Sequence, residues 1–472
     1  MLFNSYEFIL CFLPLTWLVY FLLSYKVSEK SAKYFLILAS LLFYSYWDLS
    51  NLPILLVSIG INYAFGVLLS KKRSLLFLSF GVAFNILFLC YFKYTDFIIS
   101  NINILMDSNI PLQNIVLPLG ISFFTFTQTA YLVDVYRGGT NGYSKSDCLL
   151  FVTIFPHLIS GPILYHKDMI PQFSDSSRYK INYENIYYGI LVFTIGLLKK
   201  VIIADRLAVY ANVVFDGASK LTMLDAWFGT LAYTLQLYFD FSGYSEMAIG
   251  IGLLFNYNLP VNFNFPYSAT SIIDFWRRWH MTLSAFLKNY LYIPLGGNRT
   301  GHHLRNIFVT MFLGGLWHGA GWTFIFWGCL HGLFICINHL WRKLNYNMPK
   351  LLAWFLTFNV VNIAWIYFRA NSIEKANSII QTMFDLNSFM FPYSRSLAKY
   401  FDCFGNHDMQ LIFNDGINIL GCLLLSLICY NVDDIKKLKT KYVYGITIVI
   451  ACVLAFSILN LNMESEFLYF QF

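Results

Sequence analysis

Long apolar runs, separated by short polar segments, fill this chain from one end to the other. A helix needs about 20 apolar residues to cross the hydrocarbon core of a bilayer. The runs that approach or reach this length are Phe8–Tyr25, Tyr34–Trp47, Leu52–Leu69, Leu75–Phe92, Ile115–Val135, Leu149–Tyr165, Ile186–Leu198, Ala226–Phe255, Leu351–Phe368, Ile417–Val432 and Val443–Leu461. The pattern predicts an all-α membrane protein that crosses the bilayer many times.

Composition supports this fold class. Of the 472 residues, 58% are hydrophobic and 12% are charged, whereas about a quarter of the residues in a soluble domain are charged. Because the apolar runs occur throughout, we expect one membrane domain over residues 1–472. The net charge of +7 falls mostly in short loops, which indicates contact with membrane lipid headgroups and not with nucleic acid.

Basic residues in the loops predict the orientation, because cytoplasmic loops carry an excess of Lys and Arg. The expected cytoplasmic markers are Lys26, Lys30, Lys33, Lys71, Lys72, Arg73, Arg342, Lys343, Lys350, Lys436, Lys437, Lys439 and Lys441. The final span then runs outward, so the tail 462–472 is expected on the extracytoplasmic side.

Between Arg137 and Asp274 the number of membrane crossings that the loop charges require leaves one segment that is re-entrant or lies flat. Leu149–Tyr165, which two prolines and a glycine interrupt, is the best candidate.

The stretch Asp274–His339 concentrates polar groups that are scarce elsewhere, including six of the nine histidines. Its second part, extended by one residue to Ile307–Leu340, lies between two basic cytoplasmic markers. Its roughly 34 residues make about 50 Å of helix, less than the ~60 Å that two full crossings need. We therefore expect a hairpin of short or broken helices that turns at GGLWHGAG, with His318 near its deepest point.

The first part of this stretch, Asp274–Tyr290, is expected to be one amphipathic helix at the cytoplasmic face. Asp274 and Arg278 are four residues apart and can pair, and His280 falls at the border of the apolar stripe. One interpretation is a membrane anchor without chemistry. The other places His280 at a cytoplasmic mouth whose arginines attract a phosphate-bearing donor.

A histidine at membrane depth calls for a functional explanation. A neutral imidazole in a dry site can accept a proton from a hydroxyl, and His318 is the candidate for that role; the alternative is a buried structural histidine. Asp240 and Glu246 also lie in an apolar span, where they would orient a histidine, line a proton path or pair with Arg or Tyr. The histidines show no metal-ligand spacing such as H-E-x-x-H, so we expect no metal site.

At DFWRRWHMTLSAFLKNYLYIPLGGNR and GGLWHGAGWTFIFWGCLHG the chain resembles the membrane-bound O-acyltransferase superfamily. Further matching stretches are LPLGISFFTFTQTAYLVDVYRG, FPHLISGPILY, YFDFSGYSEMAIGIGLLFNYNLPVNFNFPY and the tail EFLYFQF. The resemblance is to the bacterial branch of alginate and peptidoglycan O-acetyltransferase membrane components and of the teichoic acid D-alanyl transfer protein. It implies about eleven transmembrane helices, with re-entrant and interfacial segments, around a funnel that thins the membrane.

The resemblance also implies a catalytic core at 271–340. Its near-invariant histidine corresponds to His318 and its second catalytic position to His280; we expect His318 to act as base and His280 as positioner or oxyanion partner. The substrate-binding positions that we expect are Asp274, Arg277, Trp279, Ser284, Trp317 and Trp322. In the tail, Tyr469 belongs to a Phe-x-Tyr-Phe pattern and is expected to relay the acyl group; the alternative is an aromatic plug.

The implied reaction moves acetyl from acetyl-CoA across the bacterial cytoplasmic (inner) membrane to an envelope polysaccharide, through a periplasmic SGNH-type transferase. Peptidoglycan is the first choice of polymer and an alginate-like exopolysaccharide the second. D-alanyl transfer to teichoic acid, from a carrier protein, is the third. A lipid or protein acyltransferase and a transporter without catalysis remain as alternatives.

Overall fold

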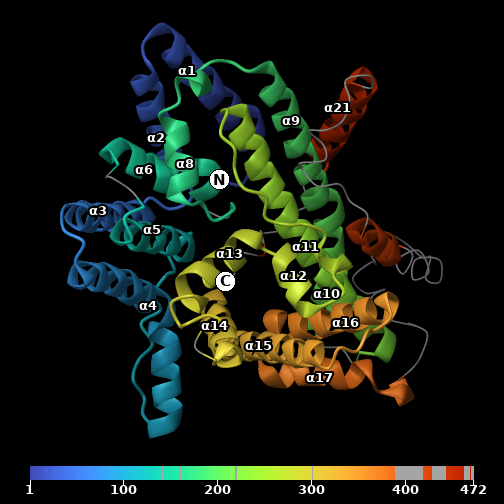
Figure 1. Cartoon of the computed structure of the whole chain (residues 1–472). Coiled ribbons are helices and arrows are strands. Elements are labelled where there is room, and N and C mark those ends of the chain that lie inside the picture. The colour runs from blue at the N-terminus through green and yellow to red at the C-terminus, as the bar shows by residue number, and fades with distance from the viewer. Residues whose placement is uncertain are drawn as a thin grey trace.

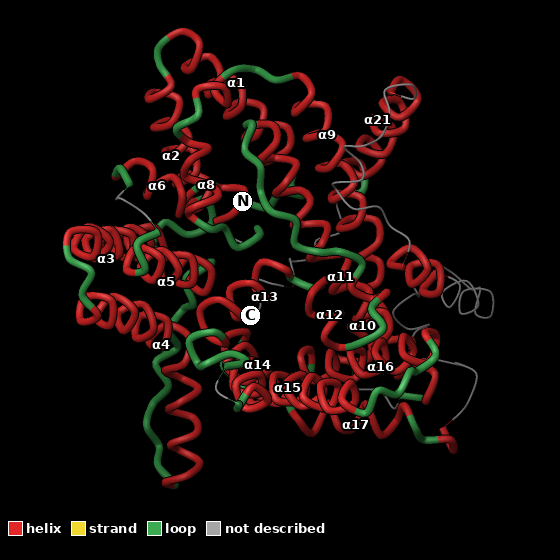
Figure 2. Tube along the Cα trace, in the orientation of Figure 1, coloured by secondary structure: helices red, strands yellow, loops and turns green. Residues whose placement is uncertain are grey.

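The structure, a computed structural model, describes residues 1–139, 143–158, 161–217, 221–299, 301–388, 418–427, 443–461 and 468. All regular elements in these ranges are helical (Figures 1 and 2). The α-helices of the first half are α1 Leu13–Lys26, α2 Glu29–Ser45, α3 Asn51–Lys71, α4 Leu75–Met106, α5 Ile121–Tyr136, α6 Lys145–Thr153, α7 Phe155–Leu158, α8 His166–Phe173, α9 Tyr183–Leu198 and α10 Asp205–Phe215. Those of the second half are α11 Met223–Leu254, α12 Ile272–Arg278, α13 Met281–Leu287, α14 His303–His318, α15 Trp322–Lys343, α16 Lys350–Arg369, α17 Ile373–Met383 and α21 Val443–Leu459.

Three π-helical turns and three 3-10 turns complete the list of elements. They are η1 Glu7–Phe12, η2 Ser176–Tyr179, η3 Lys199–Ala204, η4 Pro266–Ser268, η5 Lys288–Tyr292 and η6 Leu386–Ser388. The turn η3 joins α9 to α10, so that the predicted span Ile186–Leu198 belongs to a longer helical segment, Tyr183–Phe215.

Six helical segments in the described part of the chain are long and apolar enough to cross a membrane. They are Glu7–Lys26, Asn51–Lys71, Leu75–Met106, Tyr183–Phe215, Trp322–Lys343 and Lys350–Arg369. Shorter apolar helices cover Asn418–Leu427 and Thr447–Leu459. The predicted all-α, multi-pass membrane fold is confirmed.

The segment around Leu149–Tyr165 contains no long helix. It is divided among α6, the single turn α7 and an irregular stretch before α8, and α6 has only 9 residues. At 1.5 Å per residue, α6 is about 14 Å long, which is less than half of the hydrocarbon core. A helix of this length is too short to cross the bilayer, and the placement of this segment as re-entrant or flat stays a prediction.

Helix α11 is the central element of the bundle, buried along nearly its whole length against α9 and α10 (Figure 1). Glycines let α9 and α11 approach closely. A Cβ atom at Gly243 would lie 2.7 Å from the carbonyl oxygen of Gly196, and one at Gly250 would lie 2.6 Å from that of Gly189. Small residues at such crossings favour dense helix packing in membranes.

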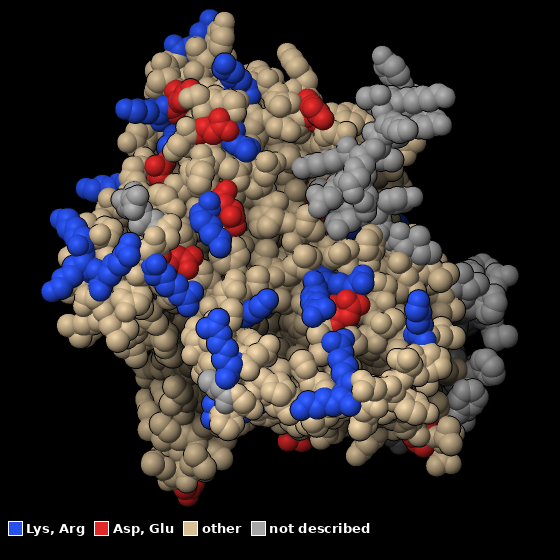
Figure 3. Space-filling model, in the orientation of Figure 1, with Lys and Arg blue, Asp and Glu red and all other residues tan. Residues whose placement is uncertain are grey.

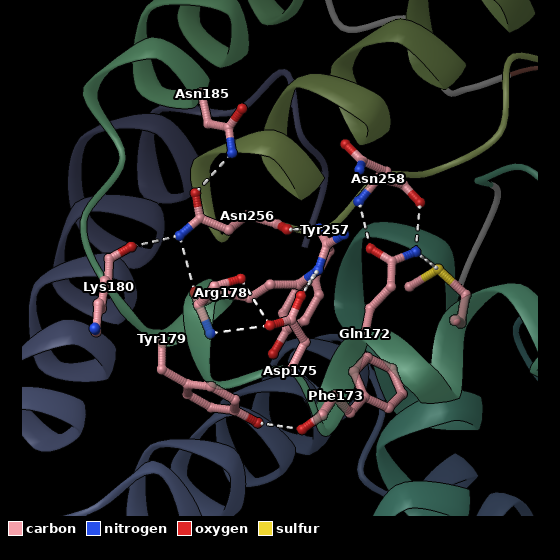
Figure 4. A network of polar contacts seen from close by, with 12 residues as sticks. Gln172, Phe173, Asp175, Arg178, Tyr179, Lys180, Asn185, Asn256, Tyr257 and Asn258 are labelled. Carbon is pink, nitrogen blue, oxygen red and sulfur yellow. Dashed lines mark hydrogen bonds and ion pairs between the residues drawn. The ribbon is translucent and has the colours of Figure 1, made fainter.

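A polar network fixes the chain where it leaves α11 (Figure 4). The side chain of Asn256 donates to the carbonyl oxygens of Arg178 at 2.9 Å and Lys180 at 2.7 Å, and it accepts from Asn185 at 2.9 Å. The backbone N–H of Asn258 donates to Gln172 at 2.9 Å. These bonds anchor the beginning of the segment that leads from α11 to α12.

The expected single helix Asp274–Tyr290 is wrong, because the structure divides it into α12 and α13. His280, between the two helices, has a left-handed backbone with φ 42°. The residues at the break bond outside the helix: Arg278 accepts from Asn264 N–H at 2.9 Å, and Met281 N–H donates to the Asn262 carbonyl at 2.9 Å. A distant segment thus supplies hydrogen bonds that a continuous helix would make internally.

The predicted hairpin is present as α14 and α15, which pack side by side and turn at residues 319–321 (Figure 1). His318 is the last residue of α14, as the turn prediction requires. The expectation of short or broken helices holds for α14, with 16 residues, and is wrong for α15, whose 22 continuous residues make about 33 Å of helix. A Cβ atom at Gly319 would overlap the Phe324 ring, which is why glycine is required at this turn.

Candidate functional site

His318 lies in an aromatic enclosure at the C-terminal end of α14. Its side chain is 7% exposed. The imidazole makes edge contacts with Trp317, Trp327 and Phe368, with ring centroids 4.9, 5.1 and 5.2 Å away. These rings come from α14, α15 and α16, so the dry surroundings predicted for this histidine depend on three helices.

Lys93, on α4, bonds the backbone at the C-terminal end of α14. Its ammonium group donates to the carbonyl oxygens of Trp317 at 2.7 Å and His318 at 2.9 Å. The last carbonyls of a helix lack intrahelical partners and carry partial negative charge. A half-buried lysine there satisfies both carbonyls and fixes the backbone that carries the His318 imidazole.

A partly open cavity of about 280 Å³ adjoins this helix end. It is lined by Lys93 and Asp96 of α4, by Gly319 and Ala320 of the turn, and by Phe324 of α15, among others. The turn beside His318 therefore borders an accessible cavity with polar side chains in its wall.

Replacing Lys93 with methionine is expected to lower turnover by about 10- to 100-fold, with less effect on the KM for donor. Methionine has a similar length but cannot donate, so two buried carbonyls lose their partner, at about 1–3 kcal/mol each. Turnover of purified protein, with a thermal melt to confirm folding, measures this. The exposed Lys71 gives the matched control, Lys71→Met, and unchanged turnover in Lys93→Met would contradict the positioning role.

His280 is held by Asn262 at the break between α12 and α13. His280 is 1% exposed, so its expected place at the border of an apolar stripe is wrong: the break turns the imidazole into the core. Its position at a cytoplasmic mouth stays a prediction. The Nδ1 atom lies 3.1 Å from Asn262 Oδ1, which also accepts from Thr282 N–H at 3.2 Å. Because Asn262 Oδ1 accepts, Nδ1 of His280 donates, and the lone pair is on Nε2.

A third histidine, His331 of α15, completes the cluster. It is fully buried, and its Nδ1 accepts from the indole N–H of Trp276 at 3.2 Å. Because an indole only donates, the proton of a neutral His331 is on Nε2. His280 and His331 both lie within electrostatic range of His318. The fold therefore brings together three histidines that are separated by up to 51 positions (331 − 280).

Basic side chains lie in the last turns of α12 and α15. Arg277 of α12 and Arg342 and Lys343 of α15 are exposed, and all three act electrostatically on His339. Arg342 also reaches Ser271 at 3.5 Å. We call Arg277, Arg342 and Lys343 the basic rim; Lys and Arg side chains are seen over this region in Figure 3. Such a rim can attract phosphate groups.

The other expected site residues lie in different places. Trp317 is buried against His318, and Trp279 is buried with its ring 5.0 Å from that of Trp365. Ser284 donates to the Trp279 carbonyl at 3.3 Å. Trp322 is 57% exposed and bonds Asn101 on α4, so the structure does not bring it to the histidines.

The predicted pair of Asp274 and Arg278 is confirmed at 3.0 Å. The Asp274 carboxylate therefore already has a partner in Arg278. Its expected role in substrate binding stays a prediction. Tyr469 lies outside the described residues, as does all of the tail 462–472 except Leu468.

Asp240 and Glu246 pair with lysines, not with the Arg or Tyr that the sequence suggested. Lys200 lies 2.6 Å from Asp240, and Lys199 lies 2.5 Å from Glu246. The two lysines are in the π-helical turn η3, which brings adjacent side chains against α11. Buried charges at this depth require such partners.

Lys93 and Asn262 were missed by the sequence reasoning. Lys93 follows directly after the predicted span Leu75–Phe92, but α4 continues to Met106 and places it inside the helix. An ionisable residue within a continuous apolar helix was the available signal. Asn262 lies in a segment without regular structure, and no local pattern marks it.

The chain is similar to known acyltransferases over most of its length. The model of "MBOAT, membrane-bound O-acyltransferase family" matches residues 7–376. A peptidoglycan O-acetyltransferase of Helicobacter pylori is 41% identical, with 100% of this chain and 98% of that protein covered. A probable alginate O-acetylase AlgI of Pseudomonas aeruginosa is also 41% identical, over 82% of this chain and 76% of that protein. A teichoic acid D-alanyltransferase of Bacillus subtilis is 28% identical, over 55% and 70%.

Proposed function

This chain belongs to the membrane-bound O-acyltransferase family, and we propose that it takes acetyl from cytoplasmic acetyl-CoA for O-acetylation of peptidoglycan outside the membrane. The observation that carries the proposal is the similarity over the whole chain to a peptidoglycan O-acetyltransferase. The buried histidine cluster supports it with a site for acyl transfer. Membership of the family makes the chain an acyltransferase with an acyl donor.

The basic rim supports a coenzyme A thioester as the donor. Arg277, Arg342 and Lys343 provide positive charge in the last turns of α12 and α15, the two helices that also carry Trp276 and His331. Phosphate groups would be held at this rim, and the pantetheine arm would reach inward toward the histidines. A carrier-bound D-alanyl thioester offers a phosphopantetheine arm without the nucleotide phosphates, which fits the rim less well.

We assign His318 as the base that takes the proton of the attacking hydroxyl. As the hydroxyl oxygen bonds to the acetyl carbonyl carbon, the carbon–sulfur bond breaks, and the departing thiolate takes up a proton. Of the two roles considered for His280, the bond to Asn262 favours positioning. A neutral His280 has its lone pair on Nε2, so it accepts a hydrogen bond there and does not donate one to an oxyanion.

We propose that the attacking hydroxyl is the phenol of Tyr469 in the tail. The acetylated tyrosine then passes its acetyl group to a periplasmic SGNH-type transferase, which modifies the polymer. This route places the protein in the bacterial inner membrane with its C-terminus outside, in accordance with the loop charges. The acetyl group crosses the membrane while coenzyme A stays on the cytoplasmic side.

Incubation of the purified protein with acetyl-labelled acetyl-CoA tests this proposal. We expect label on the protein, and transfer of that label to peptidoglycan once an SGNH-type transferase is added. Alginate is tested as a second acceptor, because the alginate O-acetylase of Pseudomonas aeruginosa has the same 41% identity to this chain. Labelling from a D-alanyl carrier protein, with none from acetyl-CoA, would overturn the acetyl assignment.

A further inference from the structure

Leu468, four positions before the last residue of the chain, is anchored inside the bundle. Its side chain is 7% exposed and belongs to the main hydrophobic core. Its backbone N–H donates to Oδ2 of Asp240 on α11, at 3.0 Å. Terminal residues are usually poorly ordered unless specific contacts hold them. A backbone donor from the tail that bonds a buried carboxylate is such a contact.

Ion pairs around the Asp240 carboxylate hold it where it accepts the hydrogen bond from Leu468. Its other oxygen, Oδ1, lies 2.6 Å from the Lys200 ammonium, which also pairs with Asp205 at 2.9 Å. Asp240 is 1% exposed and Lys200 is equally buried. A carboxylate at this depth needs donors on both oxygens, and the tail supplies the second one through a charge-assisted hydrogen bond.

The anchor lies next to the candidate site. Asp240 is about halfway along α11, and the ring of the following residue, Phe241, contacts the His280 imidazole with centroids 4.8 Å apart. Leu468 is therefore held beside the part of α11 that contacts His280.

We propose that the Asp240–Lys200 pair is a docking site for the C-terminal tail of this same chain, and that it positions the tail for acyl transfer. The purpose of docking rests on the proposed function of Tyr469, whereas docking itself does not. Apolar packing of Leu468 alone would not need a carboxylate, and a purely structural ion pair would not need the tail.

Photo-crosslinking tests docking without any acyl donor. A diazirine analogue of leucine is placed at position 468 in the full-length protein, and crosslinked peptides are mapped. We expect crosslinks to α11 near Asp240, reduced at least about tenfold in Asp240→Ala, which removes the acceptor. Asp240→Asn keeps a carbonyl oxygen and is expected to retain them. Equal crosslinking in the wild type and Asp240→Ala would overturn docking by this carboxylate.

A substitution in the tail avoids any disturbance of the buried ion pairs. Leu468→Pro removes the N–H donor and leaves Asp240, Lys200 and Asp205 in place. We expect acetyl transfer to fall at least about tenfold with the KM for donor unchanged, whereas Leu468→Ala, which keeps the N–H, loses much less. Equal losses in the two variants would overturn the role of this hydrogen bond.

Crosslinking from position 468 and labelling of Tyr469 by acetyl-CoA together separate docking from relay. Crosslinks that depend on Asp240, in a protein that never carries label on Tyr469, would preserve the docking site and overturn the relay. Label on Tyr469 together with crosslinks that ignore Asp240 would preserve the relay and overturn the docking site.

Discussion

Replacing His318 with alanine is expected to abolish acetyl transfer while the protein remains folded. General-base catalysis contributes typically about 10²- to 10⁴-fold, and His318 is the imidazole that the Lys93 contacts hold at the end of α14. The surrounding rings of Trp317, Trp327 and Phe368 would still enclose the site. Transfer of label from acetyl-CoA is the measurement, with size-exclusion elution and a thermal melt to show that the fold persists.

His302 supplies the matched control for this experiment. It is exposed just before α14 and has no role in the proposed site, so His302→Ala should keep wild-type transfer. His318→Gln tests the chemistry more closely, because glutamine retains hydrogen bonding but cannot act as a base near neutral pH. Robust turnover in either His318 variant would rule out its assignment as the base.

Replacing Tyr469 with phenylalanine is expected to remove acetylation of the polymer and all label from the tail. Phenylalanine keeps the aromatic ring and lacks only the hydroxyl that would carry the acetyl group. Binding of acetyl-CoA should be unchanged, because the basic rim lies on α12 and α15. Mass spectrometry of the C-terminal peptide, together with assay of the modified polymer, measures both effects.

A second Tyr→Phe variant controls for the loss of a hydroxyl in general. Tyr183, at the start of α9, is 82% exposed and is not part of the site, so Tyr183→Phe should behave as wild type. If Tyr469→Phe still modifies the polymer normally, the tail is an aromatic plug and the hydroxyl that attacks the thioester belongs to another molecule.

The local sequence pattern predicted structural features correctly where a single helix or turn determines them. Five of the predicted apolar runs lie within helical segments long enough to cross a membrane: Phe8–Tyr25, Leu52–Leu69, Leu75–Phe92, Ile186–Leu198 and Leu351–Phe368. Glycines between two apolar runs predicted the α14–α15 turn with His318 beside it. The four-residue spacing predicted the pair of Asp274 and Arg278. Each of these features depends on residues within one or two helical turns, or on a single reversal of the chain, so the signal is contained in the local sequence.

Predictions failed where a distant segment competes with the local preference. Periodicity favoured one helix over Asp274–Tyr290, but Asn262 and Asn264 bond the backbone at its centre and break it. The break turns His280 inward, where amphipathic periodicity had placed it at a border. Charge pairing of Asp240 with Lys200 likewise depends on the packing of η3 against α11, which no spacing within either element reveals.

The sequence by itself determined that this protein is an all-helical membrane acyltransferase, because hydrophobic length and the family's motifs are properties of the linear chain. Only the tertiary structure decided which groups surround the histidines. Lys93 meets the carbonyl of His318 across 225 positions, and Leu468 meets Asp240 across 228. Such contacts form where packed helices bring buried donors to buried acceptors, and in a dry interior every such group requires a partner.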